Sequence, residues 1–140
     1  MSDWNQKIIE EFRANGGQVG GDFAGAPLLL LHSVGARSGQ DRVSPVMYLL
    51  DDGRYLVFAS KAGAPTNPDW YHNLKAHPRA IIEVGHHTLQ VDAVELEGEE
   101  RTRMYNRQAE LYPGFATYQE NTDRVIPVVA LIPVPVTPVQ

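Results

Sequence analysis

The feature that most constrains the fold is the spacing of short apolar segments along the chain. Residues 43–50 and 54–60 are separated by only three residues, as are residues 79–84 and 88–96. The first separation contains Asp-Gly, a strong turn signal for a hairpin. Each pair is therefore predicted to form an antiparallel hairpin, because parallel strands need a crossover of a dozen or more residues.

Two further apolar segments complete the predicted sheet. Residues 27–34 are almost continuously apolar, which is typical of a buried strand, and residues 125–132 form the last strand. A split antiparallel β-barrel, closed or partly closed and with helices at its rim, fits this order. The predicted fold class is therefore mainly β with helices (α+β). We expect one domain over residues 1–140, with a helix and connector over 1–26 and the barrel over 27–133.

Helices are predicted where capping signals precede amphipathic segments. In chain order, these signals are Asp3, Asn67 followed by Pro68 as the first helical residue, and a Thr117–Glu120 capping box. A further helix is predicted from about Glu99 to Tyr112, where Pro113-Gly114 ends it.

The first helix is predicted to form a separable arm. Trp4, Ile8, Ile9 and Phe12 fall on one face, and a glycine-rich connector follows over residues 15–26. The apolar face is expected to cover the body or a partner. Peripheral membrane association through it is a weaker alternative, since the helix lacks the basic face that membrane-surface helices favour.

Composition and charge exclude several classes of protein. The absence of cysteine excludes disulfides, thiol catalysis and cysteine-based zinc sites, and the net charge of −5 argues against nucleic acid as the main partner. The sequence shows neither a membrane-spanning apolar run nor a secretory signal, so a cytoplasmic protein is expected. Residues 23–82 carry six basic and four acidic side chains, whereas residues 83–123 carry three and nine. This asymmetry fits either chance scatter or binding of a small anion by the first half.

The loop between the first two predicted strands is a candidate anion site. It reads Gly35-Ala36-Arg37-Ser38-Gly39-Gln40-Asp41-Arg42. Two glycines four residues apart permit a tight loop with exposed backbone N–H groups, and the arginines suit phosphate or carboxylate. The loop matches neither the Walker A pattern nor Gly-x-Gly-x-x-Gly. An ordinary polar loop is an equally good interpretation.

A second candidate lies where a predicted strand gives way to a helix. Ser60 and Lys61 end the strand, a glycine-bearing loop follows, and Trp70 lies at the start of the helix. Backbone amides at these two ends are expected to face the same space, which favours an anion or a polarised carbonyl. In the alternative interpretation, Trp70 anchors the core and Lys61 is a solvated charge.

The histidines do not form a metal-binding pattern. His72 and His77 are five residues apart on a helix and do not share a face, and His86 and His87 are adjacent in a turn. We therefore predict no metal site. The sequence also lacks a Gly-x-Ser-x-Gly elbow, so it offers no clear hydrolytic machinery.

Aromatic residues gather late in the chain. Tyr105 and Tyr112 share one helix face, and Phe115 and Tyr118 follow closely. Core packing is the more frequent meaning of such a stripe, and a wall for a flat aromatic ligand is the alternative.

Two motifs in these candidate regions are specific enough to indicate a family. The first is Gly35-x-x-Ser38-Gly39-x-x-Arg42-Val43-x-Pro45. The second is Ala59-Ser60-Lys61-Ala62-Gly63-Ala64-Pro65-x-x-Pro68-Asp69-Trp70-Tyr71-x-Asn73-Leu74. Both resemble the deazaflavin-dependent nitroreductase family, and the resemblance extends to Thr122-Asp123-Arg124-x-Ile126-Pro127-Val128 near the end of the chain.

The resemblance implies a split barrel of the FMN-binding type and the cofactor coenzyme F420, an 8-hydroxy-5-deazaflavin with a phosphate and an oligoglutamate tail. By motif position, the residues expected near the phosphate and tail are Arg37, Ser38, Gln40 and Arg42. Those expected near the ring system, or near ring and phosphate, are Pro45, Val46, Ser60, Lys61, Ala62 and Gly63, with Trp70 closing the pocket.

The implied activity is transfer of a hydride from reduced F420 to a quinone, enone or nitroaromatic acceptor. The candidate catalytic residues are Ser60 and, on the substrate side, Tyr112 and Tyr118. The hydroxyl of Ser60 or of a tyrosine is expected to polarise the acceptor. Two alternatives remain open, namely an FMN-dependent split-barrel oxidoreductase and a non-enzymatic F420 carrier. The expected partner is a small-molecule electron acceptor. The oligomeric state stays open between a monomer and the homodimer that split barrels often form.

Overall fold

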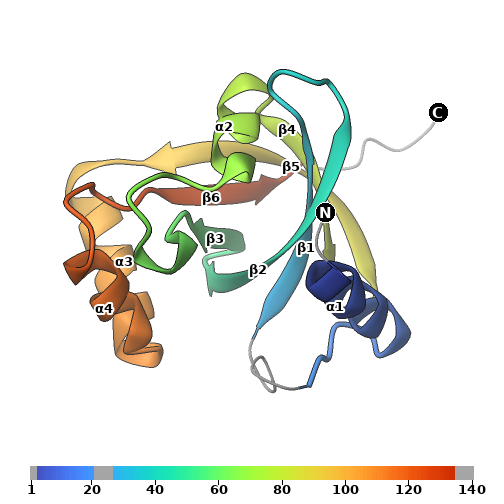
Figure 1. Cartoon of the computed structure of the whole chain (residues 1–140), viewed down its shortest axis with the longest axis horizontal. Helices are drawn as coiled ribbons and strands as arrows, with labels where there is room; N and C mark the ends of the chain where they lie inside the picture. Colours follow the sequence, from blue (N-terminus) through green and yellow to red (C-terminus); the bar gives the residue numbers. More distant parts are fainter. Residues whose placement is uncertain (1–2, 21–26, 135–140) are drawn as a thin grey trace.

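The two predicted hairpins supply four of the six strands of a closed antiparallel barrel (Figure 1). The computed structural model describes residues 3–20 and 27–134. Its elements are α1 (Asp3–Ala14), β1 (Leu28–Val34), β2 (Asp41–Asp51), β3 (Arg54–Phe58), the 3-10 turn η2 (Lys61–Gly63), α2 (Asp69–Ala76), β4 (Arg79–Val84), β5 (His87–Leu96), α3 (Gly98–Leu111), α4 (Gly114–Glu120) and β6 (Val128–Pro133).

The strands follow the order β1-β2-β3-β6-β5-β4, and β4 pairs back to β1 to close the barrel. All six pairings are antiparallel. The β2–β3 turn places Asp52 at φ +50° and Gly53 at φ +82°. A two-residue hairpin loop of the type that matches strand twist needs positive φ at both positions, which explains the Asp-Gly sequence. The predicted fold class is confirmed.

The barrel is packed both inside and outside. Its interior is filled by residues from all the strands and from α2, with Leu29, Leu31, Val57, Ile82, Val91 and Leu131 fully buried at its centre. Outside, α3 and α4 cover β3 and β6, and α1 covers β1 (Figure 1). Leu29 and Leu31 therefore face inward while Leu28 and Leu30 face α1. Burial on both faces explains the continuous apolar run of the first strand.

The first helix packs on the barrel and is not a separable arm. Ile9 and Phe12 are buried against Leu28 and Leu30, so the expectation that its apolar face covers the body is confirmed. The side chain of Trp4 and residues 21–26 of the expected connector lie outside the described part of the chain.

A carboxylate fixes the end of α1 to the sheet. Arg13 donates to Glu83 of β4 at 2.7 Å, and the same carboxylate lies 2.5 Å from Nε2 of His32 on β1. The hydrogen bond from Arg13 lowers the pKa of Glu83.

Among the helices that the structure describes, none is long and apolar enough to cross a membrane.

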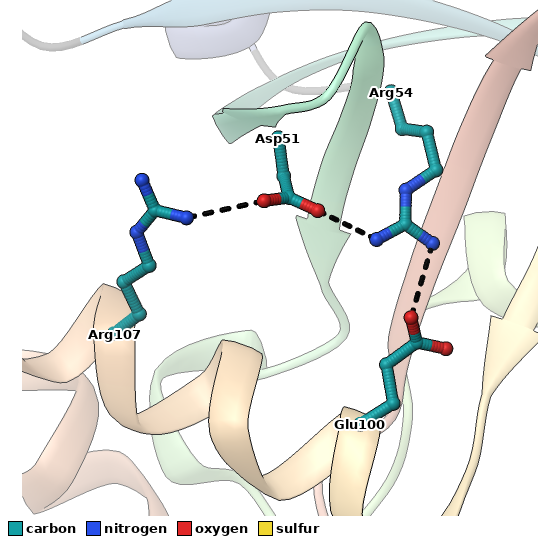
Figure 2. A network of polar contacts seen from close by, with 4 residues as sticks. All are labelled: Asp51, Arg54, Glu100 and Arg107. Carbon is teal, nitrogen blue, oxygen red and sulfur yellow. Dashed lines mark hydrogen bonds and ion pairs between the residues drawn. The ribbon is translucent and has the colours of Figure 1, made fainter.

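An ion-pair network joins the β2–β3 hairpin to α3 (Figure 2). Arg54 donates to Asp51 at 2.6 Å and to Glu100 at 3.4 Å, and Arg107 donates to Asp51 at 3.1 Å. The hydrogen bond from Arg54 lowers the pKa of Asp51. The network ties the hairpin turn to the helix that covers it.

Two predicted helix starts are wrong. The α2 helix begins at Asp69 with Pro68 before it, and no side chain caps it, because the Asn67 amide oxygen accepts a hydrogen bond from Arg124. The α4 helix begins at Gly114, three residues before the predicted capping box at Thr117.

The last strand begins at Val128 rather than at residue 125. The backbone of Ile126 is already engaged, since its carbonyl accepts from Arg101 and its N–H donates to Gln119. A residue whose two backbone groups are occupied in this way cannot join the ladder of a strand.

Candidate functional site

A cavity of about 820 Å³ lies between the β1–β2 loop and α2. Its walls include Arg37, Ser38 and Arg42 from the loop and strand, and Trp70 from the helix. The structure therefore brings together four residues that the sequence motifs assign to one cofactor site. Within the described part of the chain, neither Arg37 nor Arg42 forms an ion pair, and both are exposed. Their positive charges are thus available to an anion in the cavity.

The backbone N–H groups of this loop are mostly occupied, contrary to the expectation that they are exposed. The N–H of Gly35 donates to the carbonyl of Gln40, and the N–H of Gly39 donates to the carbonyl of Gly35. The N–H of Gln40 donates to the hydroxyl oxygen of Ser38 at 3.2 Å. The groups of this loop that remain available to an anion are therefore chiefly the guanidinium groups and the Ser38 hydroxyl.

Asn73 of α2 holds the loop against the barrel. It is buried, its amide oxygen accepts from the N–H of Ala36 at 3.0 Å, and its amide nitrogen donates to the hydroxyl of Ser33 at 3.1 Å. One side chain thereby joins the helix, the loop and the end of β1. Because Asn73 is three residues after Trp70, both lie on the helix face that borders the cavity.

The second candidate region is the segment 60–67, which we call the cofactor turn after the role that the motif resemblance predicts for it. It contains η2 and has an unusual backbone, since Lys61 adopts φ +47° and Gly63 adopts φ +82°. Ser60 is nearly buried, and the Lys61 ammonium is exposed and donates to the hydroxyl of Thr66 at 3.3 Å. The chain immediately before this turn, at Ala59, packs in the barrel interior together with Trp70.

The cofactor turn lies directly against α4. A side chain added at Gly63 would place its Cβ 2.9 Å from the carbonyl oxygen of Tyr118. Only glycine fits this approach, which explains its presence in the motif. Tyr118 is half-buried and its ring contacts the ring of Phe115 at 5.2 Å between centroids. The turn and the helix that carries Tyr118 are thus in direct contact.

The other tyrosines divide into structural and accessible groups. Tyr105 is buried and donates to the carbonyl of Phe115 at 2.6 Å, and burial raises its pKa to about 12. Tyr71 is also buried and donates to Glu95 at 2.7 Å, and burial raises its pKa to about 12. Tyr112 is half-buried against the α3–α4 cluster. Core packing explains Tyr105, whereas Tyr112 keeps an accessible surface.

The other predicted cofactor residues that can be described do not line the cavity, and these are Gln40, Pro45, Val46, Ser60, Lys61 and Gly63. Pro45 pairs with Leu30 and Val46 with Leu29, so the two side chains point to opposite faces of β2. Val46 packs in the barrel interior, and Gln40 is exposed. The side chain of Ala62 lies outside the described residues. Among the residues that can be described, no three His, Asp or Glu side chains gather as a metal site would require.

Two residues that shape the site were missed from the sequence. Asn73 is part of the quoted motif, and its spacing from Trp70 could have identified it. Arg124, which lies in the last quoted motif, donates to backbone carbonyls of the cofactor turn that are 60 and 64 residues away, and no local pattern signals that contact.

The fold and site together define the class of split-barrel proteins. A solved structure described as a domain-swapped dimer is 38% identical and covers 92% of this chain and 97% of its own, with a TM-score of 0.71. A structure of an F420-H2 dependent reductase, FDR-A, is 42% identical and covers 75% of this chain and 93% of its own, with a TM-score of 0.69.

Sequence comparison identifies the family. The model of the F420H(2)-dependent quinone reductase family matches residues 4–133. A protein of Mycobacterium tuberculosis (strain ATCC 25618 / H37Rv) described as an F420H(2)-dependent quinone reductase is 40% identical over 124 residues, which is 86% of this chain and 83% of that protein. The chain belongs to the F420H(2)-dependent quinone reductase family and is by that membership an F420-dependent oxidoreductase. The resemblance drawn from the motifs is confirmed.

Proposed function

We propose that this protein transfers a hydride from reduced F420 to a quinone, with enones and nitroaromatics as further acceptors. The observation that carries the proposal is that Arg37 and Arg42, which form no ion pair within the described residues, lie beside Trp70 in the wall of one cavity. An extended anion with a flat ring needs cations at one end and an aromatic wall at the other. Family membership supports the same assignment.

The cavity fits this cofactor in size and in chemistry. Its volume of about 820 Å³ lies within the range of roughly 300–1,000 Å³ that is typical of ligand pockets. Arg37, Arg42 and Ser38 supply donors for phosphate and carboxylate groups. When bound, F420 supplies the hydride chemistry, which explains why the protein needs no thiol or catalytic dyad.

The protein's own contribution is to orient the acceptor and exclude water. We propose that the Ser60 hydroxyl donates to the accepting oxygen or nitro group, and that Tyr112 and Tyr118 line the acceptor side. The near burial of Ser60 and the contact between the cofactor turn and α4 support this arrangement. Ser60→Ala is expected to lower turnover about tenfold, because one neutral hydrogen bond contributes about 1.4 kcal/mol. Unchanged turnover with intact cofactor affinity would remove Ser60 from this role.

Binding and turnover experiments test the proposal together. Fluorescence titration with F420 and with FMN is expected to give tight binding of F420 only. Anaerobic oxidation of reduced F420 is then followed with menadione, a nitroimidazole and a cyclohexenone, and turnover is expected with menadione. Tight FMN binding without F420 binding would support the FMN-dependent alternative. Binding of reduced F420 without oxidation by any acceptor would support the carrier alternative.

We also propose that the protein forms a homodimer through the outer face of β4, β5 and β6. Three large apolar side chains are exposed there, namely Ile81, Val94 and Ile132. The related structure described as a domain-swapped dimer supports a dimer as well. Light scattering coupled to size exclusion tests this, and Val94→Lys is expected to yield monomers.

Liposome sedimentation tests the membrane alternative, which is disfavoured by burial of Ile9 and Phe12.

A further inference from the structure

We infer that Arg124 is a positioning residue that fixes the shape of the cofactor turn and joins it, through Gln119, to the helix that carries Tyr118. The inference rests on the proposed function, since it assigns to that turn the task of holding the acceptor against the cofactor. It concerns this chain's own contacts, and these are present whether or not the cofactor is bound.

Arg124 directs three nitrogen atoms at three acceptors of the cofactor turn. Its Nε donates to the carbonyl of Ala64 at 2.9 Å, its Nη1 to the amide oxygen of Asn67 at 2.7 Å, and its Nη2 to the carbonyl of Ser60 at 2.8 Å. The guanidinium group is planar and its donors have fixed relative directions. The two ends of the turn are therefore held at a defined separation, and Ser60 is one of the anchored residues.

The turn needs such an external constraint because its backbone is unfavourable in isolation. Lys61 has φ +47°, a conformation that residues with a side chain seldom adopt. Such a conformation persists only where surrounding contacts enforce it. The bonds from Arg124 to Ser60 and Ala64 bracket Lys61 on both sides and supply this enforcement.

Gln119 extends the constraint to α4. Its amide nitrogen donates to the carbonyl of Arg124 at 2.7 Å, and its amide oxygen accepts from Arg101 at 2.7 Å and from the N–H of Ile126 at 3.1 Å. Gln119 is adjacent to Tyr118, whose backbone contacts the turn at Gly63. The helix α4, which positions Tyr118, therefore also opposes any displacement of the turn, through the hydrogen bond from Gln119 to Arg124.

The partners of Arg124 show that it does not serve as a salt bridge. All its recorded acceptors are carbonyl or amide oxygens, and within the described residues no carboxylate pairs with it. Burial lowers its pKa. A charged group held without a counter-ion is costly unless its hydrogen bonds are satisfied. Its donors are thus committed to the turn, unlike those of Arg37 and Arg42.

The test compares Arg124→Met with Arg54→Met. Arg54 is a matched control because it too is partly buried and joins two elements, but it lies at the opposite end of β3 from the turn (Figure 2). Each variant loses the hydrogen bonds that its arginine makes within the fold, so the unfolding temperature of both is expected to fall. Only Arg124→Met is expected to release the turn.

Digestion by a lysine-specific protease reports the turn without any cofactor. The chain has three lysines, at positions 7, 61 and 75. The quantity measured is the rate of cleavage after Lys61 relative to that after Lys75, because cleavage tracks local opening of the chain. This ratio is expected to rise about tenfold in Arg124→Met and to change less than about twofold in Arg54→Met. An unchanged Lys61 ratio in Arg124→Met would overturn the inference.

Steady-state kinetics supply the second measurement. In Arg124→Met, kcat with menadione is expected to fall about tenfold while the F420 dissociation constant changes less than about threefold, because the cavity cations are intact. Equal losses in both, or an unchanged kcat, would contradict the inference. If Arg124→Met does not fold, Arg124→Lys and Asn67→Ala test the same contacts and are expected to show smaller changes in the same direction. A wild-type protein that does not oxidise reduced F420 would refute the proposed function and leave the digestion result unaffected.

Discussion

Arginines perform opposite tasks in the two halves of the site. At the cavity, Arg37 and Arg42 are exposed and have no ion-pair partner in the described residues, so their donors are available to a ligand. At the cofactor turn, by contrast, the N–H groups of Arg124 donate hydrogen bonds to the protein's own carbonyl groups. The number of unsatisfied donors, rather than residue type or charge, separates a binding residue from a positioning residue.

The largest expected effect comes from reversing the charges at the cavity. The double variant Arg37→Glu with Arg42→Glu replaces two attractive charges by two repulsive ones and is expected to weaken F420 binding about 100-fold at about 0.01 M salt. At about 1 M salt the loss should shrink to less than about tenfold. Fluorescence titration measures both values. Arg103→Glu, an exposed change on α3, is the control and should have little effect; an equal loss there would show that net charge alone is responsible.

The next largest effect is expected at Asn73, which holds the cavity loop as Arg124 holds the turn. Asn73→Ala leaves the N–H of Ala36 and the hydroxyl of Ser33 without their partner. The free energy of unfolding should fall by about 2 kcal/mol, as for a buried hydrogen-bonded group. F420 affinity should also fall several-fold, with kcat little changed. Urea unfolding measures the free energy, and fluorescence titration measures the F420 affinity. A loss of kcat at unchanged affinity would show that the cavity and the cofactor turn do not have separate roles.

Low pH is expected to affect Arg54, which is bonded to carboxylates, differently from Arg124, which is bonded to carbonyl groups. The pKa of Asp51 is lowered by Arg54, so this contribution to stability is present above the unfolded pKa of about 3.8 and is lost as the pH falls through the lower folded value. The stability lost in Arg54→Met, about 1 kcal/mol at pH 7, should therefore decrease below about pH 4. The loss in Arg124→Met should persist. Urea unfolding over this pH range measures both, and parallel behaviour would contradict the comparison.

The smallest effect is expected at Gln108, and with the opposite sign. Its side chain is fully buried on α3, and neither amide atom has a hydrogen-bond partner in the part of the chain that the structure describes. Gln108→Met removes these polar atoms at similar volume, so the free energy of unfolding should stay level or rise by up to about 1 kcal/mol. Thermal and urea unfolding measure the change. A clear loss of stability would indicate that the amide has a partner such as a buried water.

Local signals predicted much of the fold. The Asp-Gly turn and the spacing of apolar segments placed both hairpins, and the continuous apolar run of β1 reflects burial on its two faces. The errors occur where a distant side chain replaces a local partner. Arg124 takes the oxygen of Asn67 that was expected to cap α2, and Arg101 takes the carbonyl of Ile126 that was expected in the last strand.

The candidate site divides in the same way. Arg37, Ser38, Arg42 and Trp70 were placed together by their motifs, and all four line the cavity. The state of the loop's backbone N–H groups could not be predicted, because it depends on contacts within the loop and on the side chain of Asn73. Whether a donor is free is a property of the folded environment and not of the residue.

The position of β6 in the barrel has a consequence for the order of folding. This strand is the last in the sequence, yet it lies between β3 and β5 and pairs with both. During synthesis the sheet stays open along that line until residues 128–133 leave the ribosome, and Arg124 emerges only just before them. A nascent chain can therefore neither close the barrel nor form the contacts of Arg124 before this last part has been synthesised.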